Sequence, residues 1–68
     1  MNIQQNDAQT TVVIGLQELV ADTAPMARDQ IRAALPAGST TLDLDLSGMT
    51  FLDSSGLGVL ISLHKALR

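Results

Sequence analysis

One short stretch combines an acidic side chain, two hydroxyls and two glycines, running from Asp53 to Gly58 in the order Asp-Ser-Ser-Gly-Leu-Gly. A short apolar segment precedes it and an amphipathic segment follows, which is typical of a turn from a strand into a helix. Oxygen atoms at such a turn accept hydrogen bonds from the first free N–H groups of the helix, so we expect Asp53 or Ser54 to cap it. Ser55 is then either part of the cap or a hydroxyl available to another molecule, and the glycines permit close packing or docking.

The segment after this turn has two faces when it is placed on a helix. One broad arc is apolar and is expected to pack against the core: Leu57, Val59, Leu60, Ile61, Leu63 and Leu67. The other face is small and polar, and is expected to remain available to a docking partner: Ser55, Gly58, Ser62 and Lys65.

Asp43 and Asp45 stand one residue apart, which superficially resembles the Asp-x-Asp signature of haloacid-dehalogenase-like phosphotransferases. Two such carboxylates could hold Mg²⁺ and act as nucleophile and acid. That site requires its aspartates at the end of an apolar strand, whereas hydroxyl residues occupy positions 39–41 here. We therefore interpret the pair as the solvated face of a strand.

Other catalytic sites find no support in the sequence. Ser55 and His64, the single histidine, are nine helical residues apart, or about 13 Å at 1.5 Å per residue, and point to opposite sides. The Gly56-Leu57-Gly58 segment lacks the third glycine of a dinucleotide loop, since position 61 is Ile61. The sequence thus predicts a protein that is not an enzyme and that carries no metal or cofactor.

Composition limits the class of protein further. With 68 residues the chain forms a single domain of limited core, and without cysteine it has no disulfides, which fits the cytoplasm. The polar N-terminus is unlike a signal peptide, and no apolar run approaches the roughly 20 residues that span a bilayer. A net charge of −3 with four Lys and Arg argues against nucleic acid. Because 46% of the residues are hydrophobic, another molecule is expected to cover part of the surface.

Periodicity predicts five elements: a strand over about 11–19, a helix over about 24–35, a strand over about 41–46, a short strand over about 49–52 and a helix over about 54–67. Gly15 marks a bulge or close approach in the first strand. Asp22 and Thr23 supply a cap for the first helix, with Pro25 in its first turn.

Apolar and acidic residues alternate over 41–46, which indicates a sheet covered on one side only. Residues 49–52 are expected to return apolar side chains to the core. The order strand, helix, strand implies a right-handed crossover between parallel strands. The predicted fold class is therefore α/β, with a mixed sheet covered by helices mainly on one face, while residues 2–9 are either a frayed arm or an edge strand.

The stretch from Asp53 to Gly58, preceded by Leu-Asp-Leu-Ser-Gly-Met-Thr-Phe-Leu over 44–52, resembles the signature of anti-sigma factor antagonists, which are small STAS-domain proteins. A weaker similarity covers Val-Ile-Gly-Leu over 13–16, Glu-Leu over 18–19 and Thr-Ala over 23–24. The family usually carries an aspartate after the Glu-Leu pair. This sequence has Val20 there, and Asp22 is the nearby acid that could take its place.

The resemblance implies that Ser55 is phosphorylated by a cognate serine kinase with an ATPase-type fold, which also holds a sigma factor. Unphosphorylated antagonist captures this kinase, phosphorylation releases it, and a metal-dependent phosphatase resets Ser55. The partner interface implied by the motif comprises Asp53, Ser54, Ser55, Gly56, Gly58, Ser62, Asp22 and Thr23.

Members of the resembled family continue with further strand and helix units, so the 68 residues are expected to be a partial STAS domain, truncated after the second helix. Such a fragment leaves a sheet edge and an apolar helix face uncovered and should form a homodimer or a swapped oligomer. Two other functions remain open: a STAS subunit of a lipid or anion transporter complex, in which Ser55 is never modified, and a fragment of a metal-dependent phosphotransferase.

Overall fold

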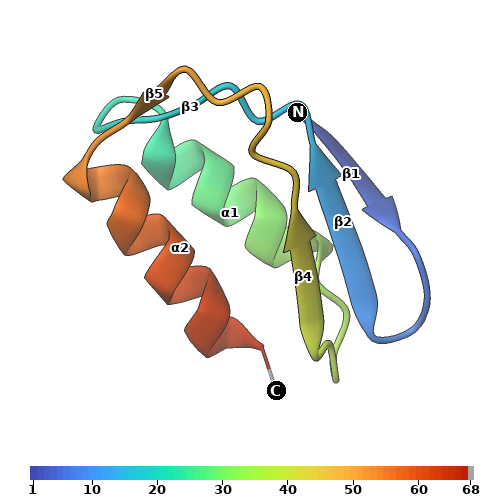
Figure 1. The fold of residues 1–68 in the computed structure, drawn as a ribbon. Coiled ribbons are helices and arrows are strands. Elements are labelled where there is room, and N and C mark those ends of the chain that lie inside the picture. Colours follow the sequence, from blue (N-terminus) through green and yellow to red (C-terminus); the bar gives the residue numbers. More distant parts are fainter. Residues whose placement is uncertain (68) are drawn as a thin grey trace.

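The fold places two helices beside a small mixed sheet. The computed structural model describes residues 1–67, in which the elements are β1 (Asn2–Gln5), β2 (Thr10–Ile14), β3 (Glu18–Leu19), α1 (Ala24–Ala34), β4 (Thr41–Leu44), β5 (Phe51–Leu52) and α2 (Ser54–Ala66) (Figure 1). The main sheet has the order β1-β2-β4, with β1 antiparallel and β4 parallel to β2. Both helices lie on the same side of this sheet (Figure 1). The expected α/β class with a mixed sheet is confirmed. Within residues 1–67, no helix has both the length and the apolar character that crossing a membrane requires.

The N-terminal segment forms an edge strand and a turn. β1 pairs with β2 over its whole length, with Asn2 opposite Ile14. Asp7 closes the turn between them, because its Oδ1 accepts hydrogen bonds from the N–H groups of Gln9 and Thr10, both at 2.8 Å. Of the two alternatives that the sequence left open for this segment, the edge strand is the one observed.

The strand expected over 11–19 is interrupted at Gly15. The backbone of Gly15 adopts φ +74°, a left-handed conformation that glycine tolerates best. The chain therefore leaves the main sheet, and Glu18 and Leu19 pair in parallel with Phe51 and Leu52 in a separate two-stranded sheet. The prediction of one continuous strand was wrong because alternation of apolar residues continues through a turn that only the backbone geometry reveals.

A helical crossover joins the two parallel strands of the main sheet. α1 follows β3 and returns the chain to β4, where Thr11 lies opposite Leu42 and Val13 opposite Leu44. β4 ends two residues earlier than expected. The Asp45 N–H still bonds to the Val13 carbonyl at 2.9 Å, but the Asp45 side chain then accepts a hydrogen bond from Ser47 N–H and begins a turn.

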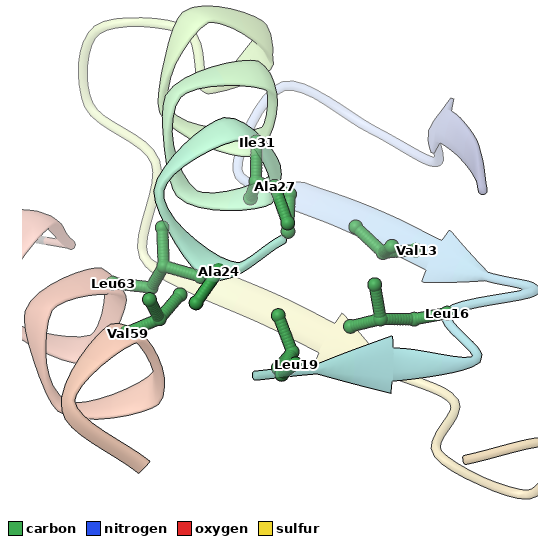
Figure 2. Close-up of a cluster of buried hydrophobic side chains, with 8 residues drawn as sticks. All are labelled: Val13, Leu16, Leu19, Ala24, Ala27, Ile31, Val59 and Leu63. Carbon is green, nitrogen blue, oxygen red and sulfur yellow. The ribbon is translucent and has the colours of Figure 1, made fainter. Parts of the chain in front are cut away.

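A core of eight buried apolar residues joins the helices to β2 and β3 (Figure 2): Val13, Leu16, Leu19, Ala24, Ala27, Ile31, Val59 and Leu63. Two expectations about packing were wrong. Leu57 and Ile61 are 52% and 58% exposed, because α2 buries only a narrow line of side chains against α1 and β3. Phe51 is 63% exposed and Leu52 is 44% exposed, so β5 contributes its backbone to the small sheet rather than these side chains to the core.

Candidate functional site

The start of α2 is held by the carboxylate of Asp53. Its Oδ1 accepts hydrogen bonds from the N–H of Ser55 at 2.8 Å and the N–H of Gly56 at 3.2 Å. Its Oδ2 accepts a third from the N–H of Ala21 at 3.1 Å, across 32 positions of sequence. The expectation that Asp53 or Ser54 caps this helix is confirmed for Asp53, which also ties α2 to the turn before α1.

The two glycines of the motif have different structural roles. A Cβ added at Gly56 would lie 2.7 Å from the Cβ of Leu19 and 2.5 Å from the Cδ1 of Leu52, and even closer to the Leu19 carbonyl oxygen. A Cβ added at Gly58 would meet nothing within 4 Å. Gly56 therefore permits the close approach of α2 to β3. Gly56 is buried, whereas Gly58 is exposed.

Ser55 lies at one end of a groove between the two helices. A hollow of about 300 Å³ is lined by Ala21, Ala24, Pro25, Arg28, Ser55, Gly58, Val59 and Ser62. A second hollow of about 410 Å³ is lined by Arg32, Gly58, Ile61, Ser62, Lys65 and Ala66. The two adjoin at Gly58 and Ser62, and together we call them the α1–α2 groove. The small, polar stripe expected on α2 is thus one wall of this groove.

The opposite wall of the groove was not predicted from the sequence. Arg28 and Arg32 of α1 line the groove, and neither belongs to the motif around Ser55. Their spacing of four residues places them on one face of a helix. That spacing was the available signal, but nothing in the sequence indicated that this face of α1 lies beside α2.

The remaining motif residues lie outside the groove. Thr23 is the N-cap of α1, but its side chain makes no hydrogen bond to a helix N–H. Its Oγ1 instead accepts a hydrogen bond from the Val20 N–H at 3.1 Å, which closes the preceding turn. The expectation that Asp22 and Thr23 supply a side-chain cap is therefore wrong, although Thr23 does occupy the N-cap position. Asp22 and Ser54 are exposed, and neither lines the groove.

In the part of the chain that the structure describes, the acidic side chains do not gather at this site. Among residues 1–67, no acidic, histidine or cysteine side chains gather in the number that a metal ion needs. The hydrogen bond from the Ser47 N–H lowers the pKa of Asp45, so this carboxylate serves the turn after β4. What the groove presents is an exposed serine, small side chains and basic side chains.

Comparison with known proteins assigns the fold to a family. A family model described as "Mlab, STAS domain" matches residues 1–68. The chain is 28% identical over 68 residues to an anti-sigma-B factor antagonist of Listeria monocytogenes and, equally, to one of Listeria innocua. The match covers 100% of this chain but 60% of each relative, so the chain spans less than two thirds of their length. No solved structure matches the chain. Because the family model covers every residue, the chain belongs to the STAS domain family.

Proposed function

We propose that this chain is a binding module of the anti-sigma factor antagonist type, and that phosphorylation of Ser55 switches its binding. The observation that carries the proposal is that the helix cap at the start of α2 does not use the side chain of Ser55. Asp53 makes both cap hydrogen bonds, so the exposed Ser55 side chain is not needed for the cap. The names of the two Listeria relatives support the same function.

The physical basis of the switch is a charge placed where the fold tolerates it. A phosphate on Ser55 adds about −1.5 to −2 charges at pH 7. Asp53 already accepts hydrogen bonds from the N–H groups of Ser55 and Gly56, and the helix dipole at this N-terminus still favours negative charge. The module therefore stays folded, while a partner docked beside Ser55 meets repulsion or a desolvation cost of about 2 to 4 kcal/mol. Such a cost lowers affinity roughly thirty- to a thousandfold.

The partner in this proposal is a cytoplasmic serine kinase with an ATPase-type fold that also acts as an anti-sigma factor. The unphosphorylated module captures the kinase, and phosphorylation of Ser55 releases it until a phosphatase removes the phosphate. Contacts would come from the exposed residues around Ser55, including Ser54, Gly58 and Asp22. The module itself performs no catalysis.

The test is affinity capture from a lysate of the source organism, with bound proteins identified by mass spectrometry. The baits are the unmodified chain, Ser55→Ala, Ser55→Asp, and Gln30→Glu as a control that adds the same single charge on the other helix, outside the groove. We expect an ATPase-fold kinase on all baits except Ser55→Asp. Equal capture of an ABC-type ATPase or transporter on all four baits would overturn the proposal in favour of a transport subunit.

A further inference from the structure

The α1–α2 groove is long enough to accommodate a short helix. Its α2 wall extends from Ser55 to Ala66, which is about 16 Å at 1.5 Å per residue, or about three helical turns. Small side chains on that wall let another backbone approach closely, and Gly58 leaves open space at the point where the two hollows meet. Ala24 and Val59 supply an apolar floor.

The charge on this groove is opposite to that of the whole chain. Formal net charge is −3, yet every lysine and arginine within residues 1–67 lines the groove: Arg28, Arg32 and Lys65. None of the seven Asp and Glu residues lines either hollow. Arg28 forms an ion pair with Asp29 at 3.1 Å on the exposed rim, and Arg32 and Lys65 are exposed.

We infer that the groove binds an acidic amphipathic helix of a protein partner. The apolar side of that helix lies on Ala24 and Val59, and its carboxylates face the basic residues of the two walls. This is the helix-in-groove mode of recognition, with charge complementarity to fix its orientation. The inference names the partner's chemistry at the site of the proposed function, and it rests on that function for the partner being a protein.

The position of Ser55 gives the groove a direct electrostatic response to phosphorylation. Ser55 and Arg28 line the same hollow. A phosphate on Ser55 carries about −1.5 to −2 charges, which offsets up to two of the three positive charges that attract an acidic helix. Phosphorylation therefore weakens binding by neutralising the groove, in addition to any local repulsion.

The experiment is an NMR titration of the ¹⁵N-labelled chain with two synthetic peptides. One is a 14-residue amphipathic helix of Leu and Glu, and the other has Gln in place of every Glu. We expect shift changes at Gly58, Ser62 and Arg32, and at least tenfold tighter binding of the Glu peptide. Affinity for the Glu peptide should fall as salt is raised from 50 to 300 mM, since exposed charges are screened.

Variants test the groove and its charge separately. Arg32→Gln and Lys65→Gln should each lower the affinity for the Glu peptide about three- to tenfold. Gly58→Leu should prevent binding of both peptides, because its side chain fills the groove. Gln30→Glu, which makes the same charge change as Arg32→Gln elsewhere on α1, should change affinity less than twofold. The dispersion of each variant's spectrum reports whether it is folded.

Equal affinity for the two peptides, shift changes confined to another surface, or unchanged affinity in Arg32→Gln would each overturn the inference. Because the titration contains neither kinase nor phosphate, its failure leaves the capture result on Ser55→Asp intact. Failure of the capture experiment alone would likewise refute the switch at Ser55 without refuting the acidic ligand.

Discussion

Each residue of the Asp-Ser-Ser-Gly-Leu-Gly motif contributes to the site in a different way. Asp53 supplies the cap, Gly56 the packing space, and Gly58 the open wall of the groove. Ser55 remains exposed beside them. Capping and packing therefore explain only part of the motif. Asp53 and Gly56 have structural roles, whereas Ser55 and Gly58 are accessible to another molecule.

Substitution of the two glycines by alanine should have opposite effects on stability. Gly56→Ala forces a methyl group against Leu19 and Leu52, and we expect it to reduce the free energy of unfolding by about 1 to 3 kcal/mol or more. Gly58→Ala meets no neighbour and lowers the entropy of the unfolded chain, so we expect a gain of about 0.5 to 1 kcal/mol. Urea denaturation followed by circular dichroism measures both values. Similar losses in the two variants would contradict this division of roles.

At the scale of elements, the turns depend on carboxylates that act as hydrogen-bond acceptors. Asp7 closes the β1–β2 turn and Asp45 begins the turn after β4. The hydrogen bond from the Gln9 N–H lowers the pKa of Asp7, and that from the Ser47 N–H lowers the pKa of Asp45. In both cases the ionised carboxylate is the form that the folded chain favours.

These shifts predict a loss of stability in acid. Because the pKa of each group is lower in the folded chain than in the unfolded chain, the stabilisation is complete above the unfolded value, about 3.8. It is lost as the pH falls from there through the folded pKa. Asp7→Asn keeps an acceptor oxygen but cannot titrate, so its free energy of unfolding should fall less between pH 5 and pH 2.

Urea denaturation across that pH range, repeated for Asp7→Asn and Asp45→Asn, provides the measurement. Each variant should show a shallower pH profile than the unmodified chain. A profile for Asp7→Asn that is parallel to that of the unmodified chain would show that the turn does not favour the ionised form.

At the scale of the whole molecule, apolar surface remains exposed beside the core. Leu57 and Ile61 lie one turn apart on α2, and Phe51 of β5 is the most exposed of the three at 63%. β4 is also an edge of the main sheet, but Asp43 on this strand opposes pairing with another edge. The sequence predicts both an uncovered sheet edge and an uncovered apolar helix face. The exposed apolar residues of α2 and β5 are therefore better candidates for self-association than the sheet edge.

We expect the chain to self-associate at micromolar concentration through these exposed apolar residues of α2 and β5. Sedimentation velocity between about 5 and 200 µM should show a rising weight-average sedimentation coefficient, because burying exposed apolar area favours association. Leu57→Gln and Phe51→Gln should shift this rise to higher concentration, and Thr41→Lys on the edge strand should not. A monomer mass across the whole range would contradict the expectation.

Local features of this protein could be read from its sequence. The Asp53 cap and the start of α2 depend on hydrogen bonds to the N–H groups two and three residues later, so adjacent residue types contain the information. The crossover helix and the parallel strand that follows it depend on apolar periodicity. The mixed α/β class and the STAS resemblance rest on these short-range patterns.

Only the tertiary structure revealed the features that depend on distant residues. The left-handed backbone at Gly15 splits a run of alternating residues between two sheets. The third hydrogen bond of Asp53 joins positions 32 residues apart and brings the turn before α1 to the start of α2. Contact between the helices places Arg28 and Arg32 opposite the stripe that begins at Ser55. Sequence periodicity determines which residues share a face of one helix, but the groove exists only because two such faces meet.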